Sequence, residues 1–233
     1  KGGMRQVFDA PRIHVGGAVA NFHLTINMPA NRWLIGVGGP SWGPAVLFWG
    51  YLLVILIASF FILGRTPRSH LKGWQWALLS LGLTQVPVSV ALIIVAWFFL
   101  VHWRSTNPLK NRLYIWHNLL QTAVGIGTMV ALFCLLGAVY NGLAVQPDMQ
   151  VSGLGSANGV LNWYTDHVTS QSPEAKVWSV PIIFWKGVML AWALWLSYSL
   201  IAWSKWGFKS FSEGDLWRNP PSREKSGTES ANR

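Results

Sequence analysis

The sequence predicts an all-α integral membrane protein: a four-helix transmembrane bundle with a short β-like N-terminal segment. Of the 233 residues, 52% are hydrophobic and only 11% are charged, whereas soluble domains carry about 25% charged residues. The chain holds four long apolar runs, and about twenty helical residues span the ~30 Å hydrocarbon core of a bilayer. The chain has sixteen tryptophans, and several of them lie at the ends of these runs, as in the aromatic belts of membrane proteins.

The N-terminal segment, residues 1–40, differs from the rest. Residues 22–26 alternate between apolar and polar and include the β-branched Thr25 and Ile26, and a turn signal follows at residues 28–31, which predicts one or two strands. Two strands alone are marginally stable, so we expect this segment to end a larger β-rich domain. An extended segment lying on the membrane surface is the open alternative. The chain begins at Lys1 without a signal-peptide pattern, which indicates a processed product or part of a longer polypeptide.

The bundle is expected over residues 41–206, followed by a polar tail at residues 207–233. The start of the tail can lie on the headgroups as an interfacial helix, and its last part is expected to be disordered. Pro44 suits the first turn of a helix. The four helices are predicted at residues 44–63, 76–101, 119–140 and 180–203.

The second apolar run carries Gln85 and Pro87 near its centre. One interpretation is a single crossing kinked at Pro87; the other is a re-entrant hairpin with its tip at residues 85–87. The positive-inside rule does not separate them, because the first gives 13 bases against 4 and the second 12 against 5. Length favours the kinked crossing, because each hairpin arm would measure only about 20 Å.

The loop at residues 141–179 is longer than a connection needs, and such loops are usually functional or disordered. It holds a strand-like stretch at residues 148–151 and an aromatic patch at residues 162–164. We predict that it folds back over residues 1–40 as an ordered cap. This requires both segments on one side of the membrane, as in the hairpin interpretation. Four simple crossings exclude the cap, and the plain four-helix bundle is the preferred arrangement.

Few side chains in the sequence suggest chemistry. Gln85, Pro87 and Lys186 are the membrane-embedded candidates, and a charge inside a membrane helix is a functional hypothesis by default. Lys186 lies close enough to the end of its run to extend its ammonium group to the interface. The four apolar runs contain no Asp or Glu, which argues against a proton-coupled transporter and against an acid–base enzyme within the bilayer.

His102 and His117 are expected near the same membrane face and are the candidates for ligands of haem or chlorophyll, with ordinary interfacial histidines as the alternative. The histidines show no metal-binding spacing, so no metal and no cofactor are predicted, although bound lipids are expected. Cys134 is the single cysteine, which excludes an intrachain disulfide. Small residues spaced by four predict close helix packing; they are Ala123, Gly127, Ala131, Gly187 and Ala191.

Several strings resemble the C-terminal membrane region of a family of large, uncharacterised proteobacterial inner-membrane proteins. These strings are NMPANRWLIGVGGPSWGPAVLFWG, WQWALLSLGLTQVPVSVAL, PDMQVSG, LNWY and FSEGDLWR. The resemblance covers most of the chain. It implies an inner-membrane location and a long β-rich extracytoplasmic region that ends in residues 1–40, but it carries no catalytic residues.

The leading functional hypothesis is a non-catalytic membrane anchor, a scaffold or an accessory subunit. Its expected partners are lipids and either other membrane subunits or its own β-rich N-terminal region. The net charge of +10 indicates anionic lipid rather than nucleic acid, because the bases are spread over loops. The alternatives are a transporter or lipid-handling component, and a haem- or pigment-binding subunit. No motif identifies an enzymatic reaction.

Overall fold

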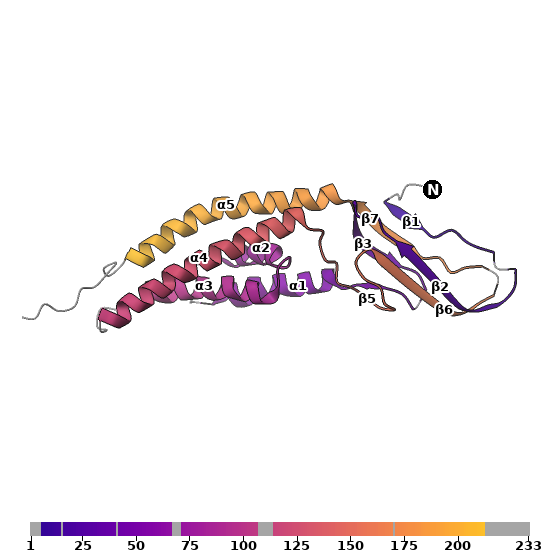
Figure 1. The fold of residues 1–233 in the computed structure, drawn as a ribbon, viewed down its shortest axis with the longest axis horizontal. Helices are drawn as coiled ribbons and strands as arrows, with labels where there is room; N and C mark the ends of the chain where they lie inside the picture. Colours follow the sequence, from indigo (N-terminus) through magenta and orange to yellow (C-terminus); the bar gives the residue numbers. More distant parts are fainter. Residues whose placement is uncertain are drawn as a thin grey trace, which may run out of the picture.

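The computed structural model describes residues 6–14, 16–40, 42–66, 71–106, 114–169 and 171–212. The molecule is elongated, with its strands gathered at one end and its helices at the other (Figure 1). We call the strand-bearing part, residues 6–47 and 145–181, the cap. The helical part, residues 48–144 and 182–212, is the bundle, and its end away from the cap is the far end.

The cap is built from two segments that lie on either side of the first four helices in sequence. The N-terminal segment gives β1 Val7–Asp9, β2 Val19–Asn27, β3 Arg32–Gly38 and β4 Ala45–Val46. The segment before the last helix gives β5 Val151–Ser152, β6 Val160–Val168 and β7 Lys176–Pro181. Each sheet joins the two segments with antiparallel pairs, in the orders β1-β7-β3, β2-β6 and β4-β5. The predicted cap is confirmed, and the arrangement that separates the two segments is wrong.

The longest ladder of the cap is β2 with β6, in which Leu24 pairs with Trp163 and Ile26 with Leu161. Alternation along a strand sends every second side chain to one face, and Ile26, Leu161 and Trp163 are buried there. Trp163 is only 2% exposed. The absence of a side chain at Gly39 and Gly43 makes room for its indole, because a Cβ at either position would come within 2.8 Å or 2.6 Å of the ring.

The bundle contains three helices that are long and apolar enough to cross a membrane, over Val88–Thr106, Asn118–Ala144 and Ile182–Lys209. A shorter apolar helix precedes them over Phe48–Leu63. The last helix continues into the predicted polar tail, of which residues 213–233 lie outside the described residues. The elements are α1 Phe48–Ala58 with a π-helical turn η1 at Ser59–Leu63, α2 Gly73–Leu83, α3 Val88–Thr106, α4 Tyr114–Ala144 and α5 Ile182–Ser212.

The helix predicted over residues 76–101 is not continuous, and the chain reverses direction between α2 and α3. The ring centroid of Trp76 lies 5.5 Å from that of Phe98, although 22 residues of straight helix would separate them by about 33 Å. The kinked single crossing is therefore wrong, and α2 and α3 form a hairpin. The tip lies toward the cap, because Thr84 and Val86 line a cavity together with Gln150.

The reversal follows from the residues at the tip. Thr84 ends α2 by donating its hydroxyl to the Leu81 carbonyl at 2.7 Å. Pro87 has no N–H and disfavours the helical conformation of the preceding residue, and α2 ends before it. The Pro87 carbonyl then accepts the N–H of Val90 at 2.9 Å, which begins α3. The inference of a single crossing from the length of the run was wrong. With 11 residues, α2 is too short to cross the bilayer, and it packs beside the C-terminal half of α1.

The contact between α1 and α2 is close and contains one buried polar pair. A Cβ on Gly64 would lie 2.3 Å from the Cα of Gly73, so the two backbones touch where the helices meet. Ser59 precedes Gly64 by five residues and Ser80 follows Gly73 by seven. Their hydroxyls are hydrogen-bonded at 2.6 Å, and both side chains are buried. Hydroxyl pairs of this kind join membrane helices without a charge.

A double-mutant cycle measures this hydroxyl pair. We expect Ser59→Ala and Ser80→Ala to couple by about 0.6 kcal/mol, the average for interhelical hydrogen bonds in membrane proteins. Thermal unfolding of the two single variants and the double variant in mild detergent provides the coupling energy. Additive effects of the two substitutions would show that the pair contributes nothing to the α1–α2 contact.

Candidate functional site

The cap meets the bundle in an aromatic group that we call the junction cluster: Trp33, Phe48, Trp49 and Trp185. The ring centroids of Trp33 and Trp185 are 5.2 Å apart, and those of Trp33 and Trp49 are 6.0 Å apart. Phe48 lies edge-on to Trp49 at 5.3 Å. Tilted and edge-on pairs at these distances are favourable beyond the area that they bury. The cluster joins β3 to the first turns of α1 and α5.

Each indole N–H of the junction cluster has an acceptor in another element. Trp49 donates to the Ile35 carbonyl at 2.7 Å, and Trp185 donates to the Gly142 carbonyl at 3.1 Å. The N–H of Trp33 lies 3.1 Å from the sulfur of Met149. The bond from Trp49 to β3 joins the bundle to the cap, whereas the bond of Trp185 holds α5 against the end of α4 and that of Trp33 lies within the cap.

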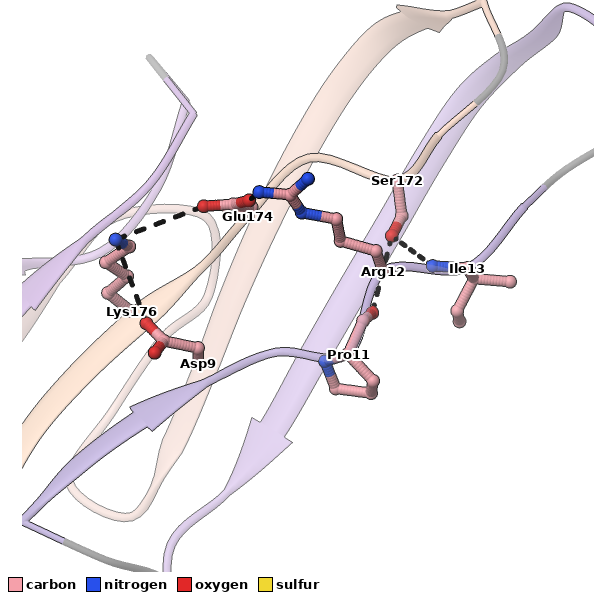
Figure 2. Close-up of polar contacts among 7 residues, drawn as sticks. All are labelled: Asp9, Pro11, Arg12, Ile13, Ser172, Glu174 and Lys176. Carbon is pink, nitrogen blue, oxygen red and sulfur yellow. Dashed lines mark hydrogen bonds and ion pairs between the residues drawn. The ribbon is translucent and has the colours of Figure 1, made fainter.

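A second polar group pins the start of the chain onto the segment that leads into β7 (Figure 2). Arg12 is paired with Glu174, and the ammonium of Lys176 lies 3.9 Å from carboxylate oxygens of both Asp9 and Glu174. Ser172 accepts the N–H of Ile13 at 2.9 Å. The charged side chains of this group are exposed to solvent in large part, so the ion pairs contribute little stability. Their effect is to position residues 9–13 beside residues 172–176.

Two neighbouring side chains that can act as acid or base lie on β6. Asp166 and His167 are both exposed on β6, and Asp166 accepts a hydrogen bond that raises the pKa of Tyr164. The Tyr164 hydroxyl also lies 2.6 Å from the side-chain oxygen of Asn21. Within the described ranges, no group of three or more His, Cys, Asp or Glu side chains is placed to hold a metal ion.

The three membrane-embedded candidates lie in two places. Gln85 and Pro87 belong to the tip between α2 and α3, where the Gln85 amide donates to the Thr84 hydroxyl at 3.0 Å and Pro87 is exposed. Lys186 is exposed in the second turn of α5, directly after Trp185 of the junction cluster. This position suits an ammonium group that extends to the interface near the cap.

The two histidine candidates lie on α3 and α4. The ring of His102 is half-buried and stacks on Trp206 of α5 with a centroid distance of 6.4 Å. His117 belongs to α4, but its side chain lies outside the described residues. The structure thus places one imidazole of the proposed pair, against a tryptophan.

The small residues predicted for packing do not form the closest helix contacts. Ala131 is buried, Gly127 is half-buried, and a Cβ on Gly127 or Gly187 would meet nothing within 4 Å. Ala123, Gly187 and Ala191 are exposed. The close approaches are elsewhere: a Cβ on Gly82 would lie 2.0 Å from the Trp192 ring, and one on Gly142 would lie 2.1 Å from Met189. Gly82 has no small residue four positions away, whereas Gly142 follows the buried Ala138 at that spacing, a pair that the sequence prediction did not include.

Two apolar cavities open on the surface of the bundle. One, of about 430 Å³, lies between α1, α2 and α3 and reaches Asp148 and Gln150 of the cap. The other, of about 500 Å³, lies between α3, α4 and α5 toward the far end. Arg104 lines the second cavity and is 1% exposed. The predicted helix ends at residue 101, which places Arg104 in a loop. The structure instead buries Arg104 in the last turn of α3.

Comparison of the chain with protein-family models, curated protein sequences and solved structures finds no match. The features from which a function can be inferred are therefore the cap, the junction cluster and the two cavities. Most of the named polar groups lie in the cap, whereas both cavities are lined mainly by apolar side chains of the bundle.

Proposed function

We propose that this protein is a non-catalytic anchor of a bacterial inner membrane, whose bundle carries the cap on the extracytoplasmic side. The cap is the attachment point for a β-rich region of the same polypeptide or for partner subunits. The main support for this proposal is the strand pairing, because every sheet of the cap joins a strand before α1 to a strand after α4. The helices between these strands therefore return the chain to the same end of the molecule, where the two segments of the cap pair.

The position of the bundle in the membrane is inferred from its surface and its tryptophans. Only 22% to 33% of the most apolar window of each long helix is buried within the chain, so most of these side chains are left for lipid. Trp185 and Trp206 lie near opposite ends of α5, about 32 Å apart at 1.5 Å per residue. This separation matches the ~30 Å hydrocarbon core, and both indoles then lie at an interface.

The distribution of charge supports the orientation. With the α2–α3 hairpin, the sequence segments on either side of the hairpin and the tail from Lys205 onward carry 12 Lys and Arg, whereas the segments before α1 and between α4 and α5 carry 5; Lys186 of α5 is left out of both counts. Bases in short loops favour the cytoplasm, so the far end is assigned there. All the acidic side chains among the described residues belong to the cap: Asp9, Asp148, Asp166 and Glu174. Carboxylates on that side do not oppose the positive-inside rule.

The cap offers strand edges on which a β-rich partner can dock. Among the described residues, β1 and β3 are the outer strands of the three-stranded sheet, and β2 pairs only with β6. An open edge presents unpaired N–H and C=O groups, to which an added strand can bond. A neighbouring β-rich region therefore has a template at the cap, consistent with the expected extracytoplasmic location of that region.

Site-specific photocrosslinking in native membranes tests this proposal. A photoreactive amino acid at Ala20, exposed on β2, is expected to give a discrete protein adduct or an internal crosslink to a preceding β-rich region. The same group at Val130, 43% exposed on α4, is the control, for which we expect lipid adducts only. An unmodified monomer from the Ala20 position would overturn the anchor proposal.

A further inference from the structure

The cavity between α3, α4 and α5 has the composition of a site for an amphipathic ligand. It measures about 500 Å³, within the ~300–1,000 Å³ range of ligand pockets. Its wall is mostly apolar, with Trp97 and Leu132 among the lining residues, and Arg104 is the only charged side chain among the described residues that line it. A wall of this kind fits a hydrocarbon chain with an acidic group at one end.

The depth of this cavity matches one leaflet of the bilayer. Leu132 lies about 18 Å along α4 from the cap-side end of that helix, and Phe208 lies about 39 Å along α5 from its start at the cap. Both residues line the cavity. With the cap at one interface, the cavity extends from the bilayer centre to the opposite headgroup region. Arg104, in the last turn of α3, lies at the headgroup end.

The charge at this end of the bundle complements an anion. The sequence has no Asp or Glu between Asp9 and Asp148 or between Glu174 and Glu213, so the helices contribute only positive charge. Arg104 is joined near the far end by Lys209 of α5. A guanidinium group matches the geometry of a phosphate with two parallel hydrogen bonds. Basic pockets between helices on the cytoplasmic side recognise anionic headgroups.

We propose that this cavity binds an anionic phospholipid from the leaflet opposite the cap. One acyl chain lies between α3, α4 and α5 against Trp97 and Leu132, and the phosphate contacts Arg104. Neither the cap nor the junction cluster contributes to this site. The lipid site therefore goes beyond the anchor role, and its test is independent of the test of that role.

Gly207 allows a test that leaves the fold intact. This residue lines the cavity, and a Cβ there meets nothing within 4 Å, so Gly207→Leu fills the cavity without a clash and improves the helix propensity of α5. Gly187 is the matched control, because it lies on the same helix, also has open space and is exposed. For the charge, Arg104→Gln is compared with Lys205→Gln, which removes an exposed base on α5.

Native mass spectrometry of the full chain in mild detergent, with equal amounts of dioleoylphosphatidylglycerol and dioleoylphosphatidylcholine, gives the readout. We expect the wild type to bind the anionic lipid at least about fivefold more than the zwitterionic one, in line with the charge preference of basic pockets. Gly207→Leu should lose the bound anionic lipid, whereas Gly187→Leu and Lys205→Gln should keep it. Arg104→Gln should bind the two lipids equally.

Two results would overturn the lipid site. One is equal binding of the two lipids by the wild type. The other is wild-type binding of phosphatidylglycerol by Gly207→Leu, with helix content unchanged by circular dichroism. If Arg104→Gln does not fold, the Gly207 and Gly187 pair still decides the outcome.

Discussion

Replacing Trp163 by alanine is expected to unfold the cap while the bundle remains helical. The indole is 2% exposed on β6, and the chain leaves space for it at Gly39 and Gly43. Truncation of a buried tryptophan to alanine costs about 3–5 kcal/mol, because the cavity collapses only partly. This is a large share of the stability of a small β unit. Limited proteolysis between residues 145 and 181 and near-ultraviolet circular dichroism in mild detergent measure the loss.

Trp42 provides the control for this substitution. It is 63% exposed, and the Trp42 main-chain carbonyl accepts the N–H of Tyr164 at 3.0 Å, an interaction that alanine retains. We expect Trp42→Ala to change stability by no more than about 0.5 kcal/mol. A Trp163→Ala protein that resists protease as well as Trp42→Ala would show that β6 does not hold the two cap segments together.

Replacing Gly82 by valine is expected to separate α2 from α5. A Cβ at Gly82 would lie 2.0 Å from the Trp192 ring, and that ring also donates a hydrogen bond to the Leu78 carbonyl at 2.8 Å. Overpacking of a well-packed core costs about 1–3 kcal/mol and occasionally more, and displacement of the ring adds the loss of its hydrogen bond, about 1 kcal/mol. The expected result is a clearly lower midpoint of thermal unfolding in detergent.

Gly125→Val is the matched control for Gly82→Val. Gly125 lies within α4, and a Cβ there would meet nothing within 4 Å. Both substitutions place a β-branched residue in a helix, so the difference between them isolates the contact with Trp192. Equal midpoints for the two variants would contradict the packing of α2 against α5.

The membrane character of the helices and the strands of the N-terminal segment follow from periodicity and composition. The alternation at residues 22–26 predicts β2, and the length of the loop before the last helix, with Trp163 in it, predicts that this loop folds back as a cap, although not that it forms β6 and β7. Both signals are local, because a strand that buries one face alternates wherever its partner lies. The pairing of this loop with residues 1–40 is predicted only by the requirement that the aromatic patch be covered.

The course of the second apolar run and the helix contacts depend on tertiary structure. Pro87 ends a helix in a kinked crossing and in a hairpin alike, so the sequence around it cannot decide between them. The contact of Trp76 with Phe98 decides it, and it is made across the turn. The contact of Gly82 with Trp192 joins residues 110 positions apart, and Arg104 was assigned to a loop because α3 was expected to end earlier.

Accessibility of single cysteines on a Cys134→Ala background tests the placement of the cap and the hairpin most directly. Ala157 reports on the cap and is exposed, while Thr66 and Thr106 report on the chain before α2 and after α3. We predict that a membrane-impermeant maleimide labels Ala157→Cys from the periplasmic side in intact cells. Thr66→Cys and Thr106→Cys should both be labelled only from the cytoplasmic side, in inverted vesicles. Labelling of Thr66→Cys and Thr106→Cys from opposite sides would contradict the hairpin and, with it, the placement of the cap.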